Sequence, residues 1–107
     1  MSLDMRIDQL VAQQRLVLRR LAESVAHEGC RLLEVGSWCG DSAVVLGNVA
    51  KRNNGKLFCI DWWKGNIGTD LERTAMHQDV FHVFWRRMKK RGLAATAVPI
   101  RASSDVV

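Results

Sequence analysis

The most informative stretch of this chain is RLLEVGSWCGDS, residues 31–42. It begins with a short apolar run, passes directly into Gly36, and ends on two residue types that favour a helix start. A short apolar run that meets a turn signal is typical of a buried strand. The stretch therefore predicts a strand, a glycine-rich turn, and a helix that is capped by Asp41 or Ser42.

The sequence on both sides continues this alternation of helix and strand. Apolar residues recur at three- and four-residue steps from Leu3 to about His27, which predicts an amphipathic helix that stops by Gly29. The further elements expected are a helix over 43–51, a strand over 56–60, a helix over 70–91 and a strand over 95–100. A strand–helix–strand unit pairs its strands in parallel through a right-handed crossover. We therefore expect an α/β fold with the element order α-β-α-β-α-β.

The expected architecture is a three-layer open parallel sheet with helices on both faces. Its strand order should be 3-2-1, which leaves the first strand at an edge. An edge strand presents unpaired backbone groups that pair readily with another chain. Because the first strand is also the most apolar one, we expect self-association through this exposed sheet edge.

Composition restricts the class of protein. The chain has 107 residues, 48% of them hydrophobic, and 16 Lys and Arg against 11 Asp and Glu, for a net charge of +5. A chain of this length forms one modest core, so we expect a single domain over 1–107, with an N-terminal helix in 1–29 and the sheet in 30–107. No apolar run approaches the roughly 18 residues of a membrane span. The N-terminus lacks the layout of a signal peptide, and a cytoplasmic location is expected.

The cysteines and histidines predict neither a disulfide framework nor a metal site. Three cysteines without a Cys-x-x-Cys pair favour reduced thiols. The three histidines lack the spacing of zinc ligands, and we expect them on a helix surface or at the margin of the core.

Two features at the ends of the predicted strands indicate a ligand site. Ligands of open α/β sheets lie beyond the carboxyl ends of the strands, where Gly36 and Gly40 would let a ligand approach the backbone. Asp61 ends the second strand about 20 residues after the turn, where an acidic side chain accepts the ribose hydroxyls of an adenosyl cofactor. The turn matches neither a dinucleotide fingerprint nor a phosphate-binding loop, so hydride transfer and nucleotide hydrolysis lose support. A simpler alternative stays open, in which Glu34 and Asp61 only bond nearby backbone N–H groups.

The motifs LEVGSWCGDS, residues 33–42, and LFCIDWWKG, residues 57–65, resemble those of S-adenosylmethionine-dependent methyltransferases. The likeness is to the small-molecule and sugar O-methyltransferase-like group in particular, and residues 84–104 look like that group's third helix and third strand. It implies the N-terminal, cofactor-binding half of a class I, Rossmann-like fold, truncated relative to the family's seven strands. The implied activity is methyl transfer from S-adenosylmethionine to an oxygen or nitrogen nucleophile of a small-molecule acceptor. The family's catalytic residues come from sequence beyond residue 107, so no catalytic base is named.

Carried over position by position, the resemblance also implies the residues of a cofactor site. Glu34 would support the glycine turn, Asp61 would hold the ribose hydroxyls, and Trp62 would lie along the adenine. The family usually contacts the adenine edge with a serine after the third strand. The implied cofactor-binding residues are Glu34, Gly36, Ser37, Trp38, Gly40, Asp61, Trp62, Ser103 and Ser104.

A competing feature is the basic run RRMKKR, residues 86–91. Such a run suits phosphate contacts, and it supports an alternative function as a non-catalytic module that binds nucleic acid or an acidic partner. On a helix, however, these charges face outward while Phe84 and Met88 face inward, and a charged helix face is usually only solvated. Neither nucleic acid nor a membrane is therefore the expected partner.

Overall fold

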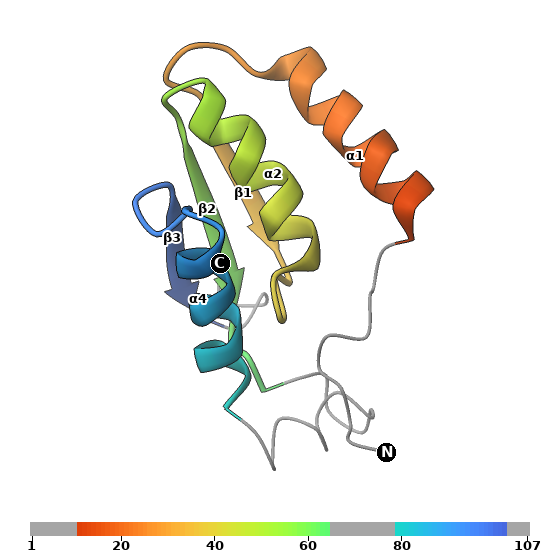
Figure 1. Ribbon diagram of the computed structural model, residues 1–107. Coiled ribbons are helices and arrows are strands. Elements are labelled where there is room, and N and C mark those ends of the chain that lie inside the picture. The colour runs from red at the N-terminus through yellow and green to blue at the C-terminus, as the bar shows by residue number, and fades with distance from the viewer. Residues whose placement is uncertain (1–10, 65–78, 103–107) are drawn as a thin grey trace.

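The computed structural model describes residues 11–64 and 79–102, which form an alternation of helices and strands (Figure 1). The elements are α1 (Ala12–Val25), β1 (Arg31–Val35), α2 (Asp41–Arg52), β2 (Lys56–Asp61), α4 (Val80–Lys90) and β3 (Ala97–Arg101). Every element expected from the sequence is found within these residues. The first ten residues of the chain and residues 70–78, which were expected to be helical, lie outside the described part.

The strands form one parallel sheet in the order β1-β2-β3. Leu32 of β1 pairs with Leu57 of β2, and Leu57 pairs in turn with Ala97 of β3. This confirms the predicted α/β class, the parallel sheet and the strand order, with β1 at one edge of the described sheet. Because right-handed crossovers join neighbouring strands in sequence, α2 and α4 lie on the same face of the sheet (Figure 1).

The core lies between the sheet and these two helices. Leu57 and Cys59 of β2 are fully buried in one cluster with Phe84 and Met88 of α4. These two α4 residues were the predicted inward stripe of the third helix, and their burial confirms it. α1 packs against the outer side of α2 (Figure 1).

The second face of the sheet carries an apolar row. Side chains alternate between the two faces of a strand, so Leu33 and Val35 share this face with Ile100 of β3. Their side chains are 62%, 55% and 40% exposed, and the expected helix cover is provided by the described residues on the other face only. Exposed apolar patches mark interaction sites, so the predicted self-association stays a prediction that this face supports.

One glycine permits the close approach of β1 and β2. Lys56 donates its backbone N–H to the carbonyl oxygen of Cys30 at 2.9 Å, just ahead of the first strand pair. A Cβ atom on the preceding Gly55 would overlap that same oxygen. Glycine at position 55 is therefore required by space. None of the described helices combines the length and the apolar character needed to cross a bilayer.

Candidate cofactor site

The carboxyl ends of β1 and β2 lie side by side. Val35 pairs with Ile60 in the sheet, and Gly36 extends this pairing by donating its N–H to the Ile60 carbonyl oxygen at 2.7 Å. The glycine turn that follows β1 is therefore held next to Asp61, the last residue of β2. The structure brings together the two features that the sequence singled out.

Asp61 joins the turn to the end of β2. Its Oδ2 atom accepts the backbone N–H of Trp38 and its Oδ1 atom accepts that of Trp63, each at 2.8 Å. The indole Nε1–H of Trp63 donates in turn to the Trp38 carbonyl oxygen at 2.6 Å. Both tryptophans have positive φ angles, 46° and 57°, which are uncommon for residues other than glycine. The Asp61 carboxylate therefore holds a strained pair of backbone segments together.

These bonds match the simpler alternative that the sequence left open for Asp61. They leave room for a second role, because each carboxylate oxygen has two lone pairs and the side chain is only half-buried. One carboxylate is thus able to fix the turn and accept hydrogen bonds from a ligand.

The two glycines of the turn serve different ends. Gly36 has a φ of +87°, and a Cβ atom built on it meets no atom within 4 Å, so this backbone faces open space. Gly40 has a φ of +96°, but a Cβ there would lie 3.0 Å from Met88 Cε and 3.2 Å from Phe84 Cδ1. Gly40 was expected to line the cofactor, whereas the structure packs it against α4.

Glu34 and Ser37 bring buried polar atoms to the turn. The Ser42 hydroxyl donates to Glu34 Oε2, while Glu34 Oε1 and Ser37 Oγ are buried without a hydrogen-bond partner among the described residues. Burial raises the pKa of the Glu34 carboxyl above its usual range; the bond from Ser42 opposes this shift and the charge of Asp61 adds to it. Buried polar groups in native proteins are nearly always bonded, so these two atoms fit a site that receives a polar ligand.

The predicted cap of α2 is wrong. Gly40 occupies the cap position and α2 begins at Asp41, whose side chain is 1% exposed and accepts from Arg15 Nη2 at 3.2 Å and Arg87 Nη2 at 3.1 Å. Ser42 bonds Glu34 instead of the backbone. The carboxylate does not cap α2 because arginines from α1 and α4 hold it. No local signal indicates this cluster, since its partners are 26 and 46 residues away.

The other residues implied by the resemblance have varied positions. Trp38 places its backbone in the turn and its side chain in the core, where it is 5% exposed. Trp62 is half-buried and follows Asp61 directly. Ser103 and Ser104 lie outside the described residues.

The cysteines near the turn have no nucleophilic character. Cys39 is 1% exposed within the turn. Burial raises the pKa of the Cys59 thiol to about 12, so this thiol stays protonated at neutral pH.

Comparison with known proteins places this geometry in context. A family model described as "Methyltransferase domain" matches residues 33–106, from β1 through the turn and Asp61 to the end of β3. The crystal structure of cofactor-bound Rv0187 from MTB is similar to this chain, with a TM-score of 0.64 and 18% sequence identity. The alignment covers 91% of this chain and 37% of that one, so this chain spans little more than a third of the length of its structural neighbour. At this identity the likeness shows the fold alone. No curated protein matches the sequence.

Proposed function

Because this chain belongs to the methyltransferase-domain family, we propose that it is the cofactor-binding portion of an S-adenosylmethionine-dependent methyltransferase. The proposed reaction moves a methyl group to an oxygen or nitrogen nucleophile of a small acceptor. The observation that carries the proposal is the contact of Asp61 with the turn, next to a Gly36 backbone that faces open space. Acidic side chains in this position accept ribose hydroxyls in nucleotide-binding sheets of this type.

Each residue at the site has a proposed part in binding. Asp61 accepts the ribose hydroxyls with the lone pairs that the backbone bonds leave over. The open backbone at Gly36 allows the cofactor to approach the turn closely. Glu34 Oε1 and Ser37 Oγ supply buried polar atoms for its polar groups. The half-buried ring of Trp62, next to Asp61, offers an apolar face for the adenine.

When bound, S-adenosylmethionine supplies a methyl group that is activated on a sulfonium, and the protein aligns the acceptor behind it. The part proposed for this chain is to bind and orient the cofactor. The raised pKa of Glu34 favours its protonated form more than water does, so Oε1 can donate as well as accept a hydrogen bond.

Calorimetric titration with S-adenosylmethionine, and separately with S-adenosylhomocysteine, tests the proposal. We expect the parent chain to bind and Asp61→Asn to lose about 1.5 to 3 kcal/mol of binding free energy, the range for a hydrogen bond to a charged group. Asp79→Asn is the matched control. Asp79 caps α4 by accepting the His82 N–H at 3.0 Å, and asparagine caps helices equally well, so this variant should bind like the parent.

Two results would contradict the proposed function. One is a parent chain that is folded by circular dichroism and binds neither ligand. The other is an Asp61→Asn variant that binds as tightly as the Asp79→Asn control.

A further inference from the structure

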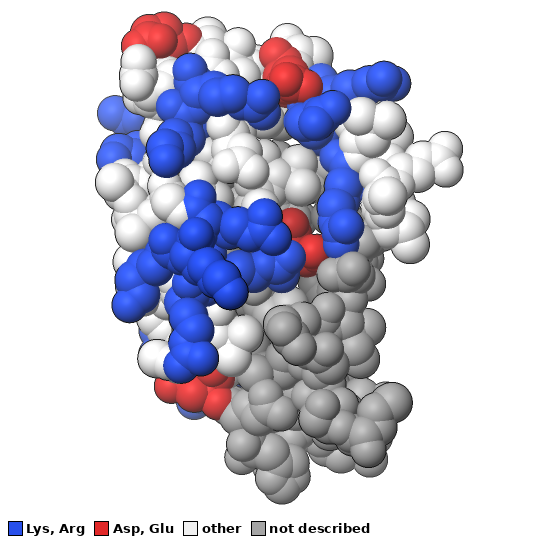
Figure 2. All heavy atoms as spheres, in the orientation of Figure 1, with Lys and Arg blue, Asp and Glu red and all other residues white. Residues whose placement is uncertain are grey.

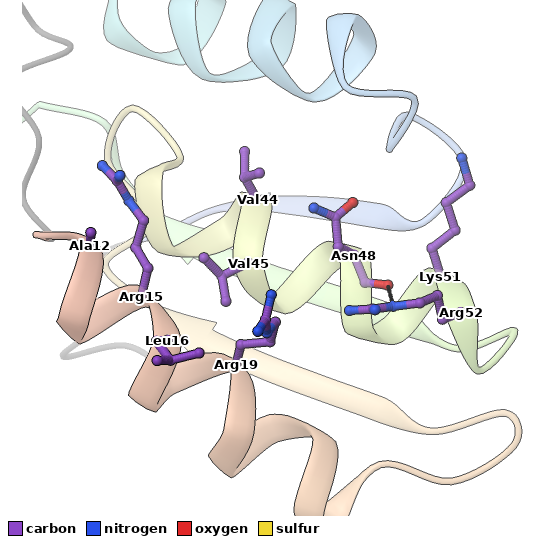
Figure 3. Close-up of a pocket in the computed structure, with 9 residues that line it drawn as sticks. All are labelled: Ala12, Arg15, Leu16, Arg19, Val44, Val45, Asn48, Lys51 and Arg52. Carbon is purple, nitrogen blue, oxygen red and sulfur yellow. Dashed lines mark hydrogen bonds between the residues drawn. The ribbon is translucent and has the colours of Figure 1, made fainter.

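A groove of about 690 Å³ lies between α1 and α2, on the side of α2 that faces α1 (Figure 3). Arg15 and Arg19 of α1 form one cationic wall, and Lys51 and Arg52 of α2 form the other. Apolar side chains, Leu16 and Val45 among them, lie between these charges (Figure 3). The lining contains four cations and no carboxylate, which is an unusual balance for a passive gap between helices.

The two arginines of α1 are held by ion pairs. Arg15 donates to Asp41 at 3.2 Å, and Arg19 Nε lies 3.7 Å from Glu23 Oε1 on the next turn of the helix. The charge of Asp41 is shared with Arg87 of α4. Cations therefore outnumber the carboxylates that fix them, and the groove keeps a positive potential.

The two cations of α2 are held by neutral acceptors. Lys51 Nζ donates to the Gly92 carbonyl oxygen at 2.8 Å, and Arg52 Nε donates to the Asn48 carbonyl oxygen at 3.3 Å. Both contacts fix the side chain without cancelling its charge. These cations are thus ordered before any ligand arrives, which lowers the entropy cost of binding.

The positive charge extends beyond the groove. Figure 2 shows Lys and Arg side chains gathered around an uncharged hollow on the face that α1, α2 and α4 share. Cations in the last turn of a helix are favoured by the helix dipole, which accounts for Lys51 and Arg52 by itself. It does not account for Arg15, which lies in the first turn of α1, where the dipole disfavours positive charge.

We propose that this groove binds the sugar–phosphate backbone of a single strand of nucleic acid. Cations along two walls suit a ligand whose negative charges repeat along its length, and the guanidinium fork matches phosphate oxygens in pairs. Two packed helices lie about 8 to 10 Å apart, which admits one chain and not a duplex. No aromatic side chain lines the groove, so bases find no stacking surface there and binding is independent of sequence.

The sequence directed attention to the basic run on α4, because its charges are adjacent in the chain. The groove cations come from two helices and are spread over residues 15–52, so no charge run reveals them. The site lies apart from the cofactor turn, and its occupation does not depend on the proposed methyl transfer.

The test is fluorescence anisotropy of a labelled single-stranded oligonucleotide, titrated with the folded chain over a series of salt concentrations. The groove variant is Arg19→Gln/Arg52→Gln, which spares the Arg15 contact with buried Asp41. The matched control is Arg20→Gln/Arg31→Gln, which removes two charges from exposed positions outside the groove. Each lost phosphate contact reduces the slope of log K against log salt by about 0.7 for a single strand, so the groove variant should lose about 1.4. The control should keep the parent's slope.

Three outcomes would overturn the proposal. The parent would fail to bind the oligonucleotide at low salt, or the two double variants would lose affinity equally, which indicates bulk charge alone. In the third, polyglutamate at equal charge concentration would displace the oligonucleotide completely, which identifies the groove as a site for an acidic protein. Calorimetry with S-adenosylmethionine is a separate readout, so failure here leaves the proposed function standing.

Discussion

Asp61→Ala is expected to loosen the turn after β1 even when no cofactor is present. Asp61 accepts backbone hydrogen bonds from Trp38 and Trp63, each 2.8 Å long. A hydrogen bond to a charged group contributes about 1.5 to 3 kcal/mol, and the half-buried position of Asp61 places each bond at the lower end. Losing both should lower the free energy of unfolding by about 3 kcal/mol. Asp61→Asn keeps one acceptor oxygen and should lose about half as much.

Urea denaturation followed by tryptophan fluorescence measures this loss, because two tryptophans belong to the affected segments. Asp79→Asn, which retains a helix-capping side chain, should unfold close to the parent. If Asp61→Ala unfolds within about 0.5 kcal/mol of the parent, the turn is held by other contacts and the reasoning fails. The measurement also separates a loss of cofactor binding from a loss of folded chain.

Three further substitutions test other parts of the structure. Asp41→Asn should lower the free energy of unfolding by about 2 to 3 kcal/mol in urea denaturation, because two arginines then face a buried neutral amide; a loss that disappears in high salt would indicate a surface ion pair instead. Gly55→Ala should melt far below Gly36→Ala, since its Cβ overlaps a carbonyl oxygen while the latter adds only about 1 to 2 kcal/mol of backbone strain; equal melting temperatures would contradict this. The native state holds the Glu34 proton more tightly than the unfolded chain, so the contribution of Glu34 to stability should fall as pH rises from 4.5 through the raised pKa. Glu34→Gln should remove that fall, and a parent and variant with parallel urea midpoints across this range would refute it.

The parts of the fold with local signals were predictable from the sequence. The apolar run of β1 and the glycine after it lie next to each other in the chain, so the strand and the turn could be placed to within a residue or two. The strand order followed from the handedness of the crossovers. The inward stripe of α4 followed from the spacing of Phe84 and Met88.

The parts that depend on distant contacts were not predictable. Gly40 looks like a ligand-facing glycine in the sequence, and only the position of α4 shows that it is a packing contact. Asp41 looks like a helix cap, and only Arg15 and Arg87, from two other helices, make it a buried ion-pair centre. The groove between α1 and α2 depends on how one helix lies against the other, which no periodicity in either helix specifies.

The Asp41 ion pairs also have a consequence for the order in which this chain folds. They join α2 to residues 26 positions before and 46 positions after Asp41, and closing long loops of chain is slow. The first turn of α2, and the glycine turn that leads into it, therefore reach their final geometry only after α4 has docked. The candidate cofactor site is thus among the last regions to form. A ligand that binds there meets a protein that has already folded, so we expect it to slow unfolding and to leave the rate of folding unchanged.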